Sequence, residues 1–245
     1  MKNTITPAEH QRIQSQYNPS FVGRYTEKAL RLHQKGFTRD TARNTLFPLL
    51  DTLKKGSSFL DLGCGAGLDM ERNIKHGFNV HGFDSSKAMV TSAKNRVGPE
   101  LVKCGDFEKR LPYEAEKFDA VYSIFALHYA KRPEVVFDQV ARILRPGGSF
   151  LAIISHPMIN YLCSRAKTYG EISIAKAPLF DRKDPVTVTH YAHTFSSFLT
   201  PRILKQFSLE NFFEQDVVHR KYKAVVIKEN VPEWFLLGLR KKENL

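Results

Sequence analysis

The chain has 245 residues, of which 42% are hydrophobic, 25% charged and 11% aromatic. These proportions are typical of a soluble globular protein and exclude a disordered, collagenous or disulfide-stapled chain. The start MKNTITPAEHQRIQ lacks an apolar run, and the most apolar stretch, residues 150–163, is interrupted and shorter than the ~18 residues that a membrane span needs. We therefore expect a single-domain cytoplasmic protein without a targeting signal or a membrane partner.

The net charge of +12 is unevenly distributed along the chain. Lys and Arg exceed Asp and Glu by 8 to 3 in residues 1–50 and by 14 to 9 in residues 165–245, whereas residues 51–164 are nearly balanced at 15 to 13. Such basic flanks attract an anionic substrate, an RNA or a membrane surface, or they are only solvated surface. The three cysteines are odd in number and widely spaced, which indicates neither a disulfide framework nor a metal site.

The first fifty residues predict helices, including residues 29–36 and a segment over residues 42–53 in which Pro48 favours a kink or a break. Residues 57–155 then alternate short apolar runs with helical patterns, which is typical of βαβ units and a parallel sheet. The expected strands are residues 58–62, 78–84, 100–106, 118–125 and 149–155. The expected helices are residues 67–77, residues 86–97, and a helix that begins at Pro133 and ends at Pro146-Gly147-Gly148.

The regular pattern is lost after the fifth strand, over residues 156–199, a length that usually carries function or a small structure of its own. Thr200 and Pro201 predict the start of a helix that runs to Gln206 and beyond. Two final strands are expected at residues 216–222 and 233–241.

A glycine-rich loop between the first strand and the following helix is the strongest functional signal. Gly63, Gly65 and Gly67 allow a tight turn and a close approach of the backbone to a ligand, and the helix that follows offers free N–H groups to a carboxylate or phosphate. Asp84 ends the second strand, where an acid accepts both ribose hydroxyls of an adenosine group. Asp106 follows Gly105 at the end of the third strand and is placed to accept from an adenine amine.

The spacing of the loop distinguishes between two nucleotide cofactors. A dinucleotide fingerprint has the pattern G-x-G-x-x-G, whereas here the third glycine comes one residue earlier and Leu68 takes its place. Asp61 would also place a carboxylate beside a pyrophosphate, which is a poor electrostatic match. A cofactor with an ammonium and a sulfonium fits better, and S-adenosylmethionine has both.

These motifs resemble those of the class I S-adenosylmethionine-dependent methyltransferases. The matching segments are FLDLGCGAG (59–67), HGFDSS (81–86), CGDFEKRLP (104–112), FDAVYSIFALHY (118–129) and RILRPGGSF (142–150). The resemblance implies a Rossmann-like α/β fold with a seven-stranded, mostly parallel sheet in the order 3-2-1-4-5-7-6, strand seven being antiparallel. The ALHY and LRPGG segments look most like small-molecule enzymes of the ubiquinone-biosynthesis and natural-product types.

The resemblance and the strand ends together give the candidate residues. The expected cofactor-binding residues are Asp61, Gly63, Cys64, Gly65, Gly67, Asp84, Ser85, Met89, Gly105, Asp106, Phe107 and Ile124. His128 and His156 follow strands four and five and are the candidate general bases. The expected acceptor-site and lid residues are Tyr17, Tyr25, Phe125, Tyr129 and His193.

The expected division of the chain follows from these assignments. Residues 1–50 form a helical lid, residues 57–155 form the cofactor-binding core, residues 156–199 form an acceptor-site insertion, and residues 200–245 complete the sheet. The histidines near His190 form an HxxH pair, but no helical context or third ligand supports a metal.

Three functions compete at this point. The first is in-line transfer of a methyl group to oxygen or nitrogen of a small molecule. The second is methylation of an RNA such as tRNA, which the basic flanks favour but the absence of an appended RNA-binding module and of a catalytic cysteine pattern disfavours. The third is a cofactor-binding regulator without catalysis, against which the intact glycine loop and both acids argue. The oligomeric state is open.

Overall fold

The computed structural model describes residues 5–33, 38–179, 186–216 and 231–243. Seven strands form one sheet in the order β3-β2-β1-β4-β5-β9-β8. The strands are β1 (Ser58–Leu62), β2 (Asn79–Asp84), β3 (Val102–Cys104), β4 (Phe118–Ile124), β5 (Leu144–Ser155), β8 (Phe207–Glu214) and β9 (Trp234–Lys241). Numbered within this sheet alone, the order is 3-2-1-4-5-7-6, and β9 runs antiparallel to both of its neighbours. The expected fold class is confirmed.

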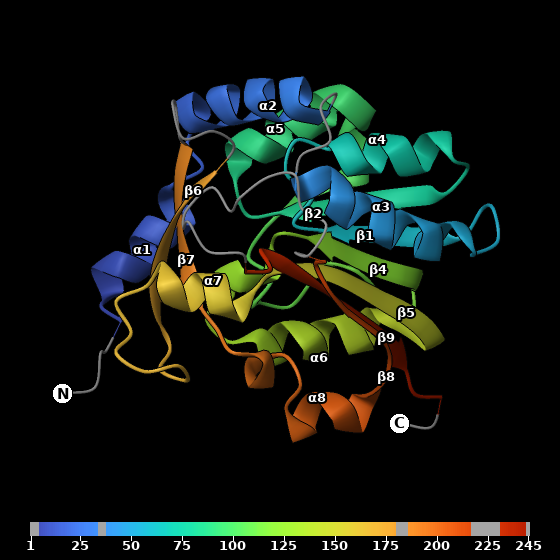
Figure 1. The fold of residues 1–245 in the computed structure, drawn as a ribbon. Coiled ribbons are helices and arrows are strands. Elements are labelled where there is room, and N and C mark those ends of the chain that lie inside the picture. Colours follow the sequence, from blue (N-terminus) through green and yellow to red (C-terminus); the bar gives the residue numbers. More distant parts are fainter. Residues whose placement is uncertain (1–4, 34–37, 180–185, 217–230, 244–245) are drawn as a thin grey trace.

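Helices cover both faces of the sheet because neighbouring strand residues point to opposite sides. Phe59 packs toward α3 (Thr38–Asp51), α4 (Leu68–Lys75) and α5 (Lys87–Val97), whereas Leu60 packs toward α6 (Pro133–Ile143) and α8 (Pro201–Gln206). Figure 1 shows α3, α4 and α5 on one face and α6 and α8 on the other. The result is a three-layer α/β/α arrangement with an apolar core on each side of the sheet.

Two helices precede α3, namely α1 (Pro7–Ser15) and α2 (Pro19–His33). The helix expected at residues 29–36 is therefore the end of α2, and residues 34–36 lie outside the described residues. The break expected at Pro48 is wrong, because α3 continues through it to Asp51. Leu46 and Leu50, on either side of the proline, are fully buried against the sheet, and this packing outweighs the loss of one helical hydrogen bond.

The start of β5 also differs from the expectation. The strand begins at Leu144, directly after α6, and not at residue 149. Leu144 pairs with Phe118, and Ser149 already pairs with Ala120, so the Arg145–Gly148 segment is a bulge within the strand. Gly147 adopts a φ of +71° in this bulge, which explains why a Pro-Gly-Gly run occurs inside a strand. β3 is shorter than expected because Pro99–Leu101 form a 3₁₀ turn.

The sixth strand of the sheet lies elsewhere than expected. β8 spans Phe207–Glu214 and starts where α8 ends, whereas a strand was expected at residues 216–222, of which 217–222 lie outside the described residues. Only Phe207 of β8 is buried, as befits a strand at the sheet edge. The sequence therefore lacks the alternation that marks a half-buried strand. Thr200 caps α8 as expected, by accepting from the Ile203 N–H at 3.3 Å.

The segment after β5 forms a small structure of its own. It contains α7 (Pro157–Leu162) and an antiparallel hairpin of β6 (Ser173–Leu179) and β7 (Val186–Ala192). Figure 1 shows α1, α7 and this hairpin grouped at one end of the sheet. This is the end where β1, β2 and β4 finish, and hence the end where an open α/β sheet holds its ligand.

Candidate functional site

The glycine loop leaves β1 through backbone conformations that other residues rarely adopt. Gly63 has a φ of +86°, and a Cβ atom built on it would lie 2.2 Å from the Cβ of Ala126. Gly67 has a φ of +78°, and its Cβ would lie 3.2 Å from Ala93 on α5. The Gly63 and Cys64 N–H groups both donate to the Phe83 carbonyl, at 2.8 and 3.1 Å, and thereby join the loop to the end of β2. Glycine is therefore required here for packing.

Asp61 is a buried acid with an unsatisfied oxygen. Its side chain is only 3% exposed, and no described residue hydrogen bonds to its Oδ2. Burial raises the pKa of this carboxyl well above its usual range, and the negative charges of Asp69 and Asp84 add to the effect. An unsatisfied buried acid is costly to the folded protein, and a cationic group of a ligand would satisfy it. The amino group of S-adenosylmethionine fits this requirement.

Asp84 organises the loop as well as the end of β2. Its Oδ2 accepts from the Gly65 N–H at 2.9 Å and its Oδ1 from the Ser86 N–H at 2.8 Å. Burial raises the pKa of Asp84, and these backbone donors oppose the rise. Each oxygen keeps a second lone pair, so the carboxylate can hold the loop and still accept from hydroxyl groups of a ribose. Ser85, between these partners, is exposed.

The third acid lies in a turn beyond β3. Asp106 Oδ1 accepts from the Glu108 N–H at 2.9 Å, and the Gly105 N–H donates to the Asp84 carbonyl at 3.0 Å. A Cβ on Gly105 would lie 2.8 Å from the Phe83 ring. Phe107 is partly buried against the core. The predicted cofactor residues after β1, β2 and β3 therefore lie along one edge of the sheet, linked by backbone hydrogen bonds.

The amino-terminal helices cover this edge. Val22 on α2 packs with Ala66 of the glycine loop and with Met89 on α5, and Tyr17 and Tyr25 lie against the same cluster. The Ser86 hydroxyl donates to the Tyr17 carbonyl at 2.8 Å. The aromatic segment before β1 thus lies directly over the predicted cofactor loop.

The turn after β4 meets both the amino-terminal cover and the hairpin. Phe125 adopts a φ of +56°, which is rare for a residue with a side chain, and Leu127–Tyr129 form a 3₁₀ turn. The Tyr129 hydroxyl lies 2.5 Å from that of Tyr17. The ring of His128 lies 4.6 Å from that of His190 on β7 and 4.4 Å from that of Tyr129. Ile124, which precedes this turn, is half-buried.

The hairpin contributes two buried histidines. Burial lowers the pKa of His190 to about 4 and that of His193 to about 4. His193 donates from Nε2 to the Ala130 carbonyl at 2.7 Å, so it holds the turn after β4 against the hairpin. Tyr191, between them, hydrogen bonds through its hydroxyl to His10 on α1. Both histidines are therefore neutral at physiological pH.

Gln16 at the end of α1 is a contact that sequence reasoning missed. Its side-chain amide donates to the Thr189 carbonyl at 2.8 Å and accepts from the Thr189 N–H at 2.7 Å, as a neighbouring strand would. The two residues are 173 positions apart, and no pattern in the sequence links them. The pairing closes the outer edge of β7 and joins the amino-terminal segment to the insertion.

His156 was expected to be a general base, and the structure gives it a local role. Its Nδ1 accepts from the Met158 N–H at 3.1 Å as the cap of α7, and its Nε2 lies 2.6 Å from Glu214 on β8. Burial lowers its pKa, although Glu214 opposes this. Since both ring nitrogens are engaged, the geometry favours a structural histidine over a base. Met158 is 43% exposed on α7.

Neither a group of metal ligands nor a membrane-spanning helix occurs among the described residues. No three His, Cys, Asp or Glu side chains in this part of the chain lie together as metal ligands would. Within the same residues, no helix is both long enough and apolar enough to cross a membrane.

Comparison with known proteins finds a family model described as a methyltransferase domain, which matches residues 60–152. The chain is 32% identical over 143 residues to 24-methylenesterol C-methyltransferase 2 of Oryza sativa subsp. japonica, covering 56% of this chain and 36% of that protein. It is 33% identical over 113 residues to the ubiquinone biosynthesis O-methyltransferase of Coxiella burnetii, covering 44% and 48%. The chain thus spans less than half the length of these two relatives.

Solved structures share the fold. An S-adenosylmethionine dependent methyltransferase from Mesorhizobium loti superimposes with a TM-score of 0.59 at 22% identity, covering 79% of this chain and 96% of that one. The matched residues 60–152 begin in β1 and end in β5, so they include the glycine loop, Asp84, Asp106 and the turn after β4.

Proposed function

We propose that the chain, whose residues 60–152 match a family model described as a methyltransferase domain, is a class I S-adenosylmethionine-dependent methyltransferase that transfers a methyl group to an oxygen or nitrogen atom of a small molecule. The observation that carries the proposal is a cluster of aromatic and histidine side chains beside the cofactor loop, and the acceptor chamber that we propose lies against this cluster. The cluster is formed by Tyr17, His128, Tyr129 and His190.

The cofactor-binding residues divide into three groups by their chemistry. Asp61 is suited to the ammonium of S-adenosylmethionine, because its unsatisfied oxygen lies in a buried position. Asp84 is suited to the ribose hydroxyls and Asp106, with Phe107, to the adenine. No side chain caps the start of α4 within the described chain, which leaves its N–H groups for the carboxylate. When bound, the cofactor supplies a methyl group on a positively charged sulfur.

The chamber is made of three segments that are remote in sequence. Tyr17 comes from the amino-terminal cover, Tyr129 from the turn after β4, and His190 from the hairpin. An aromatic wall with a few hydroxyl and imidazole groups suits a mostly apolar acceptor with one or two polar anchors. The two named relatives support an acceptor of this kind, since their names refer to ubiquinone biosynthesis and to a methylenesterol.

In-line displacement requires the chain to align the acceptor atom and to exclude water. We assign His128 as the residue that takes the proton from the acceptor, because it lies in the turn after β4 and contacts Tyr129 and His190. His190 is a poor proton acceptor, since its pKa is lowered to about 4. Its role in the chamber is to hold the His128 ring in place.

The decisive experiment incubates the full chain with S-adenosylmethionine labelled at the methyl carbon and a set of small hydroxylated and amino-bearing aromatic compounds. Mass spectrometry detects the gain of one methyl group, and ¹³C NMR separates methoxy, N-methyl and C-methyl products. His128→Gln should slow the reaction at saturating acceptor while binding S-adenosylhomocysteine as the wild type does. His76→Gln, which replaces an exposed histidine at the carboxyl end of α4, serves as the matched control.

Three results would contradict parts of the proposal. A C-methyl product would overturn the choice of oxygen or nitrogen. Methylation of RNA in place of every small molecule tested would overturn the acceptor class. An unchanged rate in His128→Gln would remove the proposed base, leaving alignment of the acceptor as the main contribution of the chamber.

A further inference from the structure

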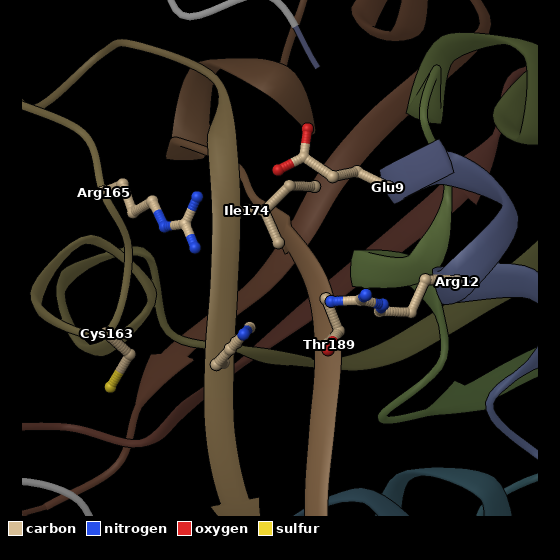
Figure 2. A pocket seen from close by; sticks show the side chains of 7 residues that line it. Glu9, Arg12, Cys163, Arg165, Ile174 and Thr189 are labelled. Atoms are coloured by element: carbon tan, nitrogen blue, oxygen red, sulfur yellow. The ribbon is translucent and has the colours of Figure 1, made fainter. Parts of the chain in front are cut away.

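A hollow lies beside the hairpin (Figure 2). Its volume is about 150 Å³, and α1, the segment after α7 and both hairpin strands form its walls. Thr189 faces this hollow, and the next residue, His190, contacts His128 in the chamber. Because neighbouring residues of a strand point to opposite faces, Thr189 and His190 face opposite sides of the hairpin.

Three cations from three separate segments line the hollow. Arg12 comes from α1, Arg165 from the segment after α7, and Lys176 from β6. They belong to the two basic flanks of the sequence, residues 1–50 and 165–245, which the methyl-transfer site does not use. The fold therefore brings part of the basic excess of both flanks together at one place.

Backbone contacts hold the segments that carry these cations. The Lys176 N–H donates to the Cys163 carbonyl at 3.1 Å, and Ser164 pairs with Ala175 as in an antiparallel sheet. The segment before Arg165 is thus fixed to the outer edge of β6. On the other side, the double hydrogen bond between Gln16 and Thr189 fixes the end of α1, one turn beyond Arg12. Hydrogen bonds to the hairpin therefore fix the segments that carry Arg12 and Arg165, and Lys176 lies on the hairpin itself.

Cations outnumber acids among the described residues that line the hollow. Among the described residues that line it, Glu9 is the one acid, and its Oε2 accepts from the Thr6 N–H at 3.0 Å in the capping box of α1. These hydrogen bonds with Thr6 lower the pKa of Glu9, so it stays ionised. Burial raises the pKa of the Cys163 thiol to about 11, so it stays neutral. The described side chains that line the hollow therefore include three cations and one carboxylate.

We propose that this hollow binds a phosphate monoester, either a soluble metabolite or the headgroup of an anionic lipid. A phosphate monoester carries nearly two negative charges at neutral pH, and cations outnumber acids among the described residues that line the hollow. Guanidinium groups suit phosphate oxygens because their N–H donors form a planar fork. Figure 2 shows the Arg12 and Arg165 side chains reaching toward the hairpin from opposite sides, with Ile174 between them. Ile174 offers an apolar wall to the carbon part of the ligand.

A ligand in the hollow would also affect the contact between α1 and the hairpin. Ile174 packs with Ile13 of α1 and with Tyr191, whose hydroxyl bonds to His10. A ligand held here stabilises the contact between α1 and the hairpin, and both of these elements cover the chamber side. The proposal concerns binding and does not depend on the identity of the methyl acceptor.

Calorimetric titration of the full chain tests the proposal with phenyl phosphate as the soluble probe. Sedimentation with phosphatidylcholine vesicles, with and without phosphatidic acid, tests the lipid headgroup. Arg12→Gln and Lys176→Gln should each weaken binding by roughly three- to tenfold at moderate salt, since each removes one charged partner from a partly screened site. Lys205→Gln, an exposed lysine on α8, is the control for net charge.

Alkylation of cysteine gives a second measurement. Bound phenyl phosphate should slow the reaction of Cys163 with a neutral maleimide, while the exposed Cys104 on β3 serves as the internal reference. Each variant must bind S-adenosylhomocysteine as the wild type does, which separates a lost anion site from lost folding. The proposal would be overturned if Lys205→Gln weakened binding as much as Arg12→Gln and Lys176→Gln do. It would also be overturned if neither phenyl phosphate nor the vesicles bound. Vesicle binding that only Arg12→Gln and Lys176→Gln reduce would assign the lipid headgroup as the source.

Discussion

The hydroxyl groups of Tyr17 and Tyr129 lie 2.5 Å apart although the residues are 112 positions apart in the sequence. Tyr17 also accepts from the Ser86 hydroxyl through its carbonyl, so one residue contacts both the end of β2 and the turn after β4. The amino-terminal cover is therefore attached at the boundary between the predicted cofactor site and the chamber. Closure of this cover should be sensitive to a single hydroxyl group.

Replacing either tyrosine by phenylalanine removes this hydrogen bond and keeps the aromatic ring. We expect Tyr17→Phe and Tyr129→Phe each to lower the free energy of unfolding by about 1 kcal/mol and to raise the KM for the acceptor. The double variant should cost less than the sum, because both substitutions remove the same bond. Urea unfolding and steady-state kinetics measure the two effects. Tyr161→Phe, which removes an exposed 3.3 Å hydrogen bond from α7 to the Lys167 carbonyl, is the control. Strictly additive losses would show that the hydroxyl groups do not interact.

Asp61→Asn should make the ligand-free protein more stable and bind the cofactor less tightly. The protonated carboxyl contributes its full stability below the ordinary Asp pKa of ~4. This contribution is lost as the pH rises through the raised pKa of the folded state, so the gain from asparagine grows with pH. We expect a gain of roughly 1 kcal/mol at pH 8 and a loss of about tenfold or more in affinity for S-adenosylhomocysteine.

The measurements for Asp61→Asn are urea unfolding and calorimetry. Asp119→Asn should have the opposite effect on stability, because Asp119 accepts from the Ser58 N–H at 2.7 Å and pairs with Arg145. A destabilised Asp61→Asn protein would show that the carboxylate is already satisfied without a ligand.

Gly63→Ala tests the packing of the glycine loop against the turn after β4. The new Cβ would lie 2.2 Å from the Cβ of Ala126, at a φ of +86°. Gly56 has the same φ with no atom within 4 Å of its Cβ position, so Gly56→Ala isolates the cost of the backbone conformation. We expect Gly56→Ala to cost about 1 kcal/mol and Gly63→Ala at least ~2 kcal/mol more, with loss of S-adenosylhomocysteine binding. Equal melting temperatures for the two variants would contradict the close contact.

Stability should fall on acidification as His193 becomes protonated. Its pKa is lowered to about 4 in the folded protein, whereas an unfolded histidine titrates near ~6.5. The unfolded chain therefore binds more protons between these values, and the stability contributed by neutral His193 is present above pH ~6.5 and lost as the pH falls toward 4. The full loss is about 3 kcal/mol at most.

His193→Gln keeps a donor for the Ala130 carbonyl and cannot take up the proton. Its unfolding free energy should therefore decline less than that of the wild type between pH 7 and pH 5. Parallel pH profiles for wild type and His193→Gln would exclude His193 as the source of the acid sensitivity.

The sequence predicted most accurately those features that depend only on residues close together in the chain. The glycine loop, the acid that ends β2 and the cap at Thr200 each follow from a local rule of backbone geometry, and the structure has them at the expected residues. The break at Pro48 was wrong because the local rule for proline ignores the burial of Leu46 and Leu50. The sixth strand was misplaced because an edge strand buries too few residues to produce an alternating pattern.

The remaining part of the site depends on contacts between distant segments. Gln16 and Thr189, Tyr17 and Tyr129, and His128 and His190 meet only after the sheet has formed. None of these residues has a special spacing in the sequence. His156 shows the converse: its position after β5 predicts a site residue, yet a carboxylate on β8 and the start of α7 engage its ring.

The pairing of Gln16 with Thr189 also determines the order in which parts of the fold can form during translation. The ribosome releases α1 first, but the strand edge that its last residues complete is made 173 residues later. A nascent chain of the first 155 residues contains every strand from β1 to β5 and lacks the hairpin. The cofactor-binding half can therefore assemble while the chain is still growing, whereas the wall of the acceptor chamber closes only after translation has passed residue 189.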